Sequence, residues 1–551
     1  MGSSINDEKH DDVVHETKHA VVNTKTALGD EAFQQAMIKE PPSYKAPIIL
    51  VLASAVAFCC STANGYDGSL FGTLLANQYF NEFFGTRNAG IGAGLVTAIY
   101  QIGGVVALPF VGPCIDTWGR RVGMLIGSTI ILLGVIIQLT CITTASVDQF
   151  MAGRFFLGFG VSIAAAAGPT YVVEISHPAH RGFVTGLYNV MWPVGALVAS
   201  GASRGAYDIG GTTSWMVPVG LQMMFPGFIA LGCMFIPESP RWLYTRNRQE
   251  EATAILTRIH GGGNRDSEWV KLQVNEYEEC LEMDGADKRW WDYRALFRNR
   301  ASIYRLMCNC IVSTFGQWAG NSIVSYYLSA FLDTAGIRGD ATQMDVGMGI
   351  NAIQIAFAAV GAGIVDTVGR RRMLLTVNIV CGICWIGVIV PASIANITDP
   401  ADEAQTSAVN PATSRAMLAF VYLFQICYSV GWTPLQALYP VEVLSYEMRA
   451  KGMAFSSLFT NAALLTTQFG VPVALDDIQW RTYIVFCVWC FVQSGILYLL
   501  VPETKNRTLE ELDHIFAAKS PVKASVAKRV YGADSDGNIL QVEDAAAVSK
   551  A

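Results

Sequence analysis

The charged stretch Asp116-Thr-Trp-Gly-Arg-Arg121 lies between two long apolar segments, Gly92–Val111 and Val122–Leu139. A helix that crosses a bilayer needs about 20 mostly apolar residues, because the hydrocarbon layer is ~30 Å thick and each helical residue advances ~1.5 Å. Both segments meet this requirement. The stretch is therefore predicted to be a short turn that joins two membrane-spanning helices.

The same pattern recurs as Asp366-Thr-Val-Gly-Arg-Arg371, offset by 366 − 116 = 250 residues. Two further patterns repeat in the same order: a Glu seven residues before an Arg, and a Pro-Glu-Ser or Pro-Glu-Thr triplet. They occur at Glu174 and Arg181, at Pro237-Glu-Ser239, at Glu442 and Arg449, and at Pro502-Glu-Thr504. Three repeated landmarks indicate a duplication whose halves have the same orientation, as in membrane transporters that rock about a central site.

The composition supports a membrane protein. Of the 551 residues 52% are hydrophobic and only 15% are charged, whereas soluble domains carry about 25% charged residues. Clear spans are Ile48–Gly65, Gly92–Val111, Val122–Leu139, Trp215–Ile236, Met348–Val365, Leu374–Ile394, Ala416–Ala437 and Tyr483–Val501, and weaker ones surround Phe156, Gly186, Ser313 and Phe455. We predict an all-α membrane protein with twelve transmembrane helices in two six-helix bundles.

The predicted organisation has five parts. Residues 1–46 form a cytosolic disordered tail, 47–236 the first bundle, 237–301 a cytosolic linker with short helices, 302–501 the second bundle, and 502–551 a cytosolic tail. The polar N-terminal tail has no basic segment followed by a short apolar run, so no cleaved signal peptide is expected.

Arg-rich and Lys-rich short loops mark the cytosolic side of a membrane protein. Such loops contain Arg120–Arg121, Arg181 and Arg370–Arg372, whereas the loop 396–410 has neither Arg nor Lys. Both termini are therefore predicted to be cytosolic. The sequon Asn396-Ile-Thr398 falls on the predicted outer side, where Asn396 is a candidate for glycosylation.

The repeated turns also carry acids. Gly119 and Gly369 permit tight turns, the Asp side chains can accept hydrogen bonds from a neighbouring helix end, and the Arg pairs can fork onto carboxylates. Membrane anchoring by positive charge alone would explain the Arg but not the paired acids. The predicted cytosolic charge network comprises Asp116, Arg120, Arg121, Glu174, Arg181, Glu238, Arg241, Asp366, Arg370, Arg371, Glu442, Arg449 and Glu503. We expect it to latch the cytosolic ends when the carrier faces outward, and to open in the other state.

Asp67 follows the apolar run of the first predicted span. A carboxyl group at membrane depth is unfavourable and marks a functional site by default. Buried there, it can exchange a proton near neutral pH. Its expected partner is Arg154, at the start of the fourth span. The alternative is that Asp67 lies at the outer water interface.

Amide and hydroxyl groups beside an aromatic face suit a sugar, whose edges are polar and whose ring faces are apolar. The second half offers Gln317, Asn321 and Tyr327, all within the segment 315–327. In the fifth span, Asn189 and Trp192 share a helix face. Any one of these residues alone is more often an interhelical hydrogen-bonding group than a ligand, so the hypothesis rests on their convergence.

These landmarks resemble those of the sugar porters of the major facilitator superfamily, over about residues 48–515. The matching motifs are Gly65-Tyr-Asp-Gly68, the two D-x-x-G-R-R turns, Arg154-Phe-Phe-Leu-Gly158, Glu174 to Gly182, Pro237-Glu-Ser-Pro-Arg-Trp-Leu243 and Pro502-Glu-Thr-Lys-Asn-Arg-Thr508. Within the family, the segments 181–192, 316–321 and 433–442 look most like the fungal lactose permease and cellodextrin transporter branch.

The resemblance implies roles for single residues. Asp67 and Arg154 match an acid and an arginine of proton-coupled members. Asn189 replaces a hexose-binding Gln, and Gln317 matches the second Gln of a pair whose first member is Gly316 here. Ala437 stands where the family has a tryptophan that stacks on hexose.

The resemblance also places further residues in the sugar site. Ser322 aligns with an Asn of the family, Asn321 precedes it, and Gln354 falls where the eighth span supplies an Asn. Losing the indole at 437 opens space for a second sugar ring, although Trp318 or Trp432 could refill it. The predicted substrate-binding residues are Asn189, Trp192, Gln317, Asn321, Ser322, Tyr327, Gln354, Trp432 and Gln436.

The sequence therefore predicts a monomeric proton-coupled sugar symporter of the plasma membrane, surrounded by lipid, for a disaccharide such as lactose or cellobiose. A hexose or other monosaccharide transporter, coupled or facilitative, is the nearest alternative. A sugar sensor on the same fold is a second, although the C-terminal tail is short for signalling. No metal, cofactor, nucleic acid or enzymatic activity is expected, because no nucleophile–base or metal-ligand set falls within the spans.

Overall fold

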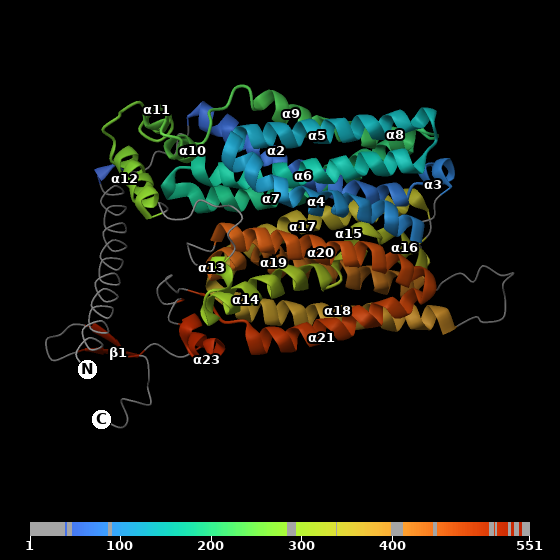
Figure 1. The fold of residues 1–551 in the computed structure, drawn as a ribbon. Helices are drawn as coiled ribbons and strands as arrows, with labels where there is room; N and C mark the ends of the chain where they lie inside the picture. Colours follow the sequence, from blue (N-terminus) through green and yellow to red (C-terminus); the bar gives the residue numbers. More distant parts are fainter. Residues whose placement is uncertain are drawn as a thin grey trace, which may run out of the picture.

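Two helical bundles lie side by side along the length of the molecule (Figure 1). The computed structural model describes residues 39–40, 47–85, 91–283, 294–337, 339–397, 411–444, 449–505, 512, 515–526, 530–533 and 539–542. Short helices cover one end of the first bundle, which we call the linker end. The opposite end carries α3 (Gln78–Phe84) and is called the α3 end.

The first half contributes eight helices to its bundle. Besides α3 they are α2 (Ile48–Leu75), α4 (Ile91–Trp118), α5 (Arg120–Thr140), α6 (Val147–Ile175), α7 (Arg181–Tyr207), α8 (Thr213–Leu221) and α9 (Met224–Gly232). Short 3₁₀ turns, η1 (Cys141–Thr143) and η2 (Pro178–His180), follow α5 and α6. Helices α8 and α9 form a single span interrupted at Gln222.

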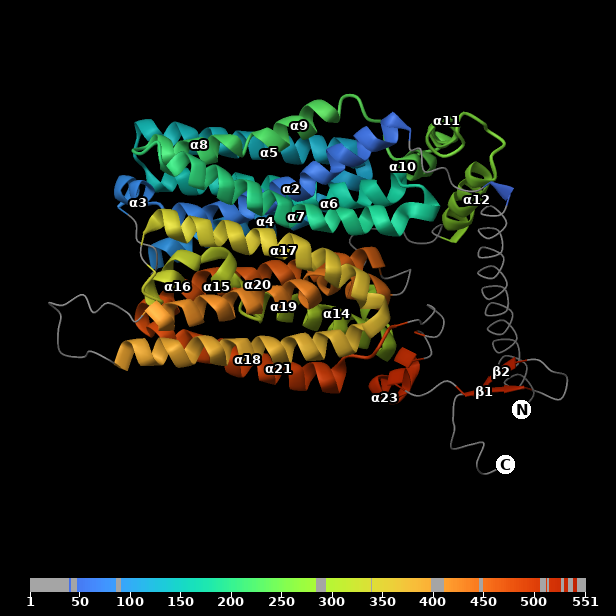
Figure 2. The same cartoon turned by 180° about the vertical axis from the view of Figure 1, so that it is seen from behind.

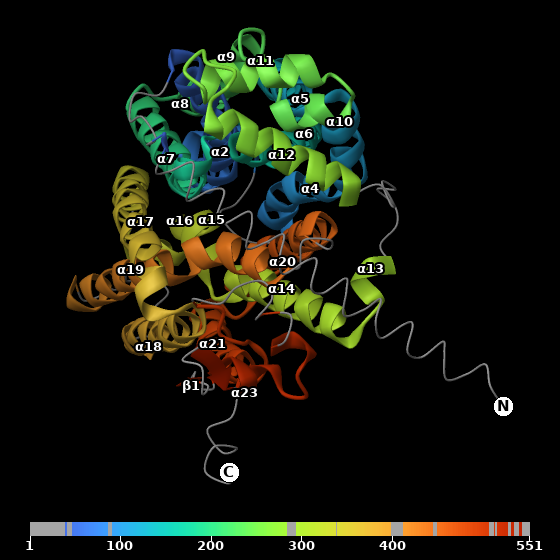
Figure 3. The same ribbon diagram turned by 90° about the vertical axis from the view of Figure 1, so that its left-hand side faces the viewer.

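The linker contains α10 (Pro240–Thr245), α11 (Gln249–Ile259), α12 (Glu268–Met283) and α13 (Arg294–Phe297). Seen from the linker end, α10, α11 and α12 lie over the first half (Figure 3). Their apolar side chains form a small core of their own around Leu243, Leu256 and Val270. The linker is therefore a folded unit rather than an extended connection.

The second half contains α14 (Arg300–Trp318), α15 (Asn321–Tyr326), α16 (Leu328–Thr334), α17 (Asp340–Val368), α18 (Arg370–Ile397), α19 (Pro411–Val443), α20 (Arg449–Asp477), η5 (Gln479–Arg481) and α21 (Thr482–Leu500). Gly320 interrupts the first of these spans with a φ of 102°, a left-handed conformation that glycine adopts without a steric penalty. Figure 2 shows the short α15 and α16 behind α17. The C-terminal tail adds α23 (Pro521–Val526) and an antiparallel pair, β1 (Val530–Ala533) and β2 (Ile539–Val542), outside the bundles.

Ten spans of the described residues are long and apolar enough to cross a membrane. The two remaining positions of the predicted twelve are α7 and the broken span α14–α16, whose polar residues lower their hydropathy. Large apolar side chains such as Phe235, Ile383 and Leu499 are more than half exposed. Their exposure fits a surface that faces lipid, where α-helices satisfy all their backbone hydrogen bonds internally.

Polar contacts join the halves toward the α3 end. The Tyr207 hydroxyl and the Gln78 backbone N–H both donate to Asp340 Oδ2, at 3.1 and 2.9 Å. An ion pair joins Arg204 Nε to Asp345 Oδ1 at 2.9 Å. The halves are therefore fastened at the end opposite the linker.

Candidate functional site

At the linker end of the first half, Arg120 and Glu174 form a two-pronged ion pair. Arg120 Nε and Nη2 donate to the two Glu174 oxygens at 2.9 and 3.1 Å. The Ser239 hydroxyl donates to the same carboxylate, and Asp116 Oδ1 lies 3.3 Å from Arg120 Nη1. Planar guanidinium and carboxylate groups match in this geometry, which makes such pairs directional.

The second half carries the same arrangement. Arg370 Nη2 and Nε donate to Glu442 at 2.7 and 3.1 Å, and the Thr504 hydroxyl donates to Glu442 at 2.6 Å. Arg370 therefore corresponds to Arg120, Glu442 to Glu174 and Thr504 to Ser239.

A glutamate caps the helix that follows each turn. Glu238 Oε1 accepts the backbone N–H groups of Arg120 and Arg121 at 3.1 Å each, at the start of α5. Glu503 accepts those of Arg370 and Arg371 at 2.8 and 3.2 Å, at the start of α18. A carboxylate is favourable at a helix N-terminus, where unpaired N–H groups point outward. Burial raises the pKa of Glu238 above its ordinary value, although these backbone N–H groups stabilise its carboxylate.

The cap differs in part from the sequence expectation, which assigned that role to the Asp of each turn. The Asp116 side chain is 67% exposed, and its ion-pair partner among the described residues is Arg120. Its backbone carbonyl instead accepts from Trp242 Nε1 and Arg246 Nη2 at 2.8 and 2.9 Å, which ties α10 to the turn. Glu238 and Glu503 cap the helices instead, because each Pro-Glu triplet passes directly beside the turn.

The other predicted members of the charge network have separate places. Arg121 and Arg371 each donate to a backbone carbonyl, of Met234 at 3.5 Å and of Tyr498 at 2.6 Å. The Arg181 Nε is buried with no hydrogen-bond partner among the described residues. Arg241 is half-buried in α10. The side chains of Asp366, Arg449 and Asn396 lie outside what the structure describes, although Asn396 falls in the last turn of α18, at the α3 end.

Among the described residues, the ion pairs Arg120–Glu174 and Arg370–Glu442 each join helices of one half, so each cluster fastens its own bundle. The prediction that the network latches the two halves together concerns the other conformational state and stays a prediction.

Asp67 is 1% exposed, in the interior of the first half. Its Oδ1 accepts a hydrogen bond from Gln222 Nε2 at 3.1 Å, whereas Oδ2 has no partner among the described residues. A carboxylate with a single amide donor is poorly compensated in an apolar interior. Asp67 therefore does not lie at a water interface in this state.

Arg154 is 2% exposed on α6 and makes no ion pair with Asp67 within 4.0 Å in the part of the chain that the structure describes. Its guanidinium carbon lies 4.4 Å from the centroid of the Phe71 ring and 5.3 Å from that of Tyr100. Ring faces attract cations electrostatically. The two groups expected to pair are thus buried near each other but separated.

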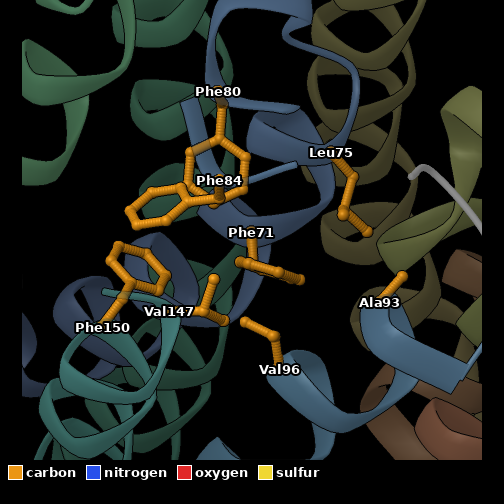
Figure 4. Close-up of a pocket in the computed structure, with 8 residues that line it drawn as sticks. All are labelled: Phe71, Leu75, Phe80, Phe84, Ala93, Val96, Val147 and Phe150. Carbon is orange, nitrogen blue, oxygen red and sulfur yellow. The ribbon is translucent and has the colours of Figure 1, made fainter. Parts of the chain in front are cut away.

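A small pocket lies at the α3 end of the first half, beside Phe71 (Figure 4). The lining is apolar throughout: Phe71, Leu75, Phe80, Phe84, Ala93, Val96, Val147 and Phe150. Without a polar group it cannot recognise a sugar, so it is not the substrate site.

In the second half, two of the predicted sugar-binding residues meet. Gln317 Nε2 on α14 donates to Gln436 Oε1 on α19 at 3.2 Å. Gln436 Nε2 donates to the Tyr428 hydroxyl at 3.1 Å, and that hydroxyl donates to the Gly316 carbonyl at 2.9 Å. Both glutamines remain partly exposed. We call Gln317, Gln436 and Tyr428 the amide cluster.

Neighbouring candidates surround this cluster. Ser322 donates to the Gln317 carbonyl and to Thr467 Oγ1, at 3.2 Å each. Asn321 begins α15 with its Oδ1 buried and without a partner among the described residues. Tyr327 is fully buried and donates to the Gln468 carbonyl. Ser322 and Tyr327 are therefore occupied by contacts within the protein.

The remaining candidates are not shown to join the cluster. Gln354 is 4% exposed on α17 and Trp432 is fully buried on α19. Asn189 is exposed on α7. The Trp192 carbonyl lies 1.9 Å from where a Cβ on Gly65 would be, so Trp192 marks the close packing of α7 on α2. Trp318 turns toward α20, where its Nε1 donates to the Ala463 carbonyl at 3.2 Å.

Two residues were missed by sequence reasoning. Gln222 binds Asp67, and Tyr428 binds both Gln436 and Gly316. Gln222 is the only amide in the otherwise apolar segment 215–236, which could have drawn attention to it. Tyr428 has no such signal, because tyrosines are common in the spans.

Comparison with protein families gives one match. The family described as "Sugar (and other) transporter" matches residues 53–516. Similar curated proteins include a high-affinity glucose transporter of Kluyveromyces lactis, 29% identical, with 83% of each chain covered. A probable quinate permease of Aspergillus fumigatus is 27% identical, with 85% of this chain and 88% of the relative covered.

Solved structures agree on the fold. The inward-open xylose transporter XylE of E. coli has a TM-score of 0.67 at 18% identity, covering 85% of this chain and 99% of that one. The XylE proton:xylose symporter bound to 6-bromo-6-deoxy-D-glucose also gives 0.67 at 18% identity, covering 86% and 100%. The predicted twelve-helix major facilitator fold is confirmed. The relatives named here are glucose and quinate transporters, so the finer resemblance to lactose and cellodextrin transporters stays a prediction.

Proposed function

The chain belongs to the sugar transporter family of the major facilitator superfamily, and from this premise we propose that it is a proton-coupled sugar symporter of the plasma membrane. The observation that carries the proposal is that the two halves hold different polar groups in their interiors. An almost unexposed carboxyl group with one free oxygen lies in the first half. A cluster of partly exposed amides lies in the second half.

Asp67 is proposed to carry the coupled proton. A charged carboxylate with only the Gln222 amide as donor is unfavourable in this interior. Arg154, the expected counter-charge, lies instead against Phe71 and Tyr100. This separation fits a protonated Asp67 that has released Arg154, and deprotonation would favour their pairing.

Alternating access is proposed to be a rocking of the two halves. Asp340 and Asp345 fasten the halves at the α3 end, and the positively charged turns support a cytosolic position for the linker end. With that orientation the present arrangement is closed toward the outside. The sugar would then leave toward the cytosol, at the end that carries the linker helices (Figure 1).

The proposed substrate is a disaccharide of the lactose or cellobiose type. Support comes from the sequence of the site, because Gly316 and Ala437 are small where the family has larger side chains. A hexose is the second candidate, favoured by curated relatives that are named glucose transporters. In both cases the amides of Gln317 and Gln436 are proposed to bind sugar hydroxyls.

Uptake of labelled lactose, cellobiose and glucose by transport-null cells tests the proposal. We expect disaccharide uptake against a gradient that a protonophore abolishes. Glucose uptake without disaccharide uptake would contradict the substrate size. Accumulation that persists with the protonophore would contradict proton coupling. If cells take up none of the three sugars, the function itself is wrong.

A further inference from the structure

We propose that Gln436 replaces residue 316 as the source of the second amide of the substrate site, and that Tyr428 positions this amide. The inference rests on the proposed function and deepens it by naming the residues that supply and orient one amide of the sugar site. Residue 316 is on α14 and Gln436 is on α19. The amide is thus supplied by α19 instead of by the neighbouring α14.

The geometry at Gly316 carries the first step. A Cβ atom built on this glycine would lie 1.8 Å from Gln436 Nε2 and 2.5 Å from its Cδ. Both distances are far below van der Waals contact, and the Gln436 amide is held by hydrogen bonds on both sides. A side chain at position 316 would therefore require the Gln436 amide to leave its present place and its hydrogen bonds.

The hydrogen bonds fix which way the amide faces. The Tyr428 hydroxyl accepts from Gln436 Nε2 and donates to the Gly316 carbonyl, so both of its roles are used. The nitrogen of Gln436 is held toward Tyr428, and Oε1 consequently faces the Gln317 donor. Tyr428 is 4% exposed and is a positioning residue, because it acts on substrate only through Gln436.

Several groups of the pair stay free for a solute. Within the described residues, Gln317 Oε1 and the second N–H of each amide have no hydrogen-bond partner. Both side chains are partly exposed. Neighbouring sugar hydroxyls, each a donor and an acceptor, match one oxygen and two N–H groups in fixed positions.

The Gln436 amide lies within the reach of a glutamine at position 316. A glutamine there would carry its amide carbon two bonds, or about 2.5 Å, beyond Cβ. The Gln436 amide carbon lies 2.5 Å from that same Cβ position, so the amide from α19 can take the place of one from α14.

A mutant cycle between positions 316 and 436 tests the replacement. Gly316→Ala should raise the KM for disaccharide about tenfold, as expected when a bound amide is displaced from its hydrogen bonds. Added to Gln436→Ala, the same change should have no further effect, because the clash is gone. In Gly316→Gln/Gln436→Ala the amide returns to α14, and the KM for disaccharide should return from the value of Gln436→Ala toward that of the wild type.

The cycle has outcomes that overturn the proposal. It is wrong if Gly316→Ala behaves like the wild type, or if its effect persists in the Gln436→Ala background. It is also wrong if Gly316→Gln/Gln436→Ala has the KM of Gln436→Ala alone. Gly363→Ala is the matched control, because nothing lies within 4 Å of its Cβ position, and its uptake should equal that of the wild type.

Tyr428→Phe tests the positioning role. Removing the hydroxyl should raise KM about fivefold with Vmax unchanged, because one hydrogen bond that orients a ligand group is lost. A change in Vmax alone would show a structural role instead and contradict the assignment.

Melting temperatures of the purified 316 and 436 variants separate this inference from the proposed function. If the wild type transports no sugar, but adding Gln436→Ala restores the melting temperature lost in Gly316→Ala, the proposed function fails and the inferred packing of Gln436 against residue 316 holds. If adding Gln436→Ala does not restore the melting temperature, the inference fails as well.

Discussion

Arg120 with Glu174 and Arg370 with Glu442 form the same ion pair in the two halves, each beside a glutamate-capped helix. The interiors of the halves differ. The first holds a buried acid and a buried arginine, Asp67 and Arg154, and the second holds an amide cluster.

The difference has a physical reason. At the linker end both halves must hold a tight turn and the start of a helix against the next loop, so the same contacts serve both. In the interior the two halves face different tasks, because a proton needs an ionisable group and a sugar needs oriented neutral donors and acceptors.

The largest effect is expected from removing the buried acid that distinguishes the interior of the first half from that of the second. Asp67→Asn should abolish accumulation of sugar against a gradient while preserving exchange of labelled for unlabelled sugar, because the amide cannot release the coupled proton. Uptake and counterflow in vesicles measure both. Asp148→Asn, at an exposed position on α6, is the control and should keep accumulation. If Asp67→Asn still concentrates sugar, the coupling site lies elsewhere.

The next prediction tests whether the duplicated pairs are equivalent. Arg120→Ala and Arg370→Ala should each destabilise the protein by about 3 kcal/mol, because each leaves a partly buried carboxylate without its counter-charge. Melting temperatures and the amount of protein at the cell surface report the loss. Arg248→Ala, whose partner Glu251 is 56% exposed, should change stability by less than about 1 kcal/mol. A large difference in the stability lost by Arg120→Ala and by Arg370→Ala would show that the two ion pairs are not equivalent.

The turn glycines allow a finer comparison. Gly119 and Gly369 have φ values of 103° and 97°, and an added Cβ would lie 2.4 and 2.8 Å from oxygens of Glu238 and Glu503. Each Gly→Ala change should lower stability by about 1–3 kcal/mol, with the larger loss at Gly119. Thermal unfolding checks the order. Equal stability of both variants and the wild type would show that the capping carboxylates move away freely.

The smallest effect concerns a feature of the first half alone. Burial and the neighbouring His260, His180 and Arg181 lower the pKa of His177 from 6.5 to about 4. Above pH 6.5 His177 is neutral in both the folded and unfolded protein. As the pH falls from 6.5 toward 4 the unfolded protein binds the proton first, so the folded protein loses stability in this window.

Replacing His177 by Asn should reduce this pH dependence. The His177 Nδ1 accepts the backbone N–H of Ala179 at 3.2 Å, and an Asn oxygen can take the same role at a helix start. Melting temperature measured from pH 7 to pH 4 should fall less in His177→Asn than in the wild type. An unchanged slope would place the pH sensitivity in other groups, such as His260.

Part of this organisation could be predicted from the sequence. The spans, the duplication and the unusual Asp67 are local or periodic features, and hydropathy and spacing detect them. The pairing of Arg120 with Glu174 was also within reach, because positive charge alone could not explain the repeated acids. The capping role of Glu238 was not, because it depends on how the loop after α9 passes the turn.

The sequence by itself determined the class of molecule: a duplicated, helical membrane protein with charged turns on one side and a buried acid in its first span. Only the tertiary structure decided which groups meet. Gln222 reaches Asp67 across 155 residues, and Gln436 reaches Gln317 across 119. Such meetings depend on the rotation and tilt of packed helices, which small residues and neighbouring helices set and no local pattern encodes.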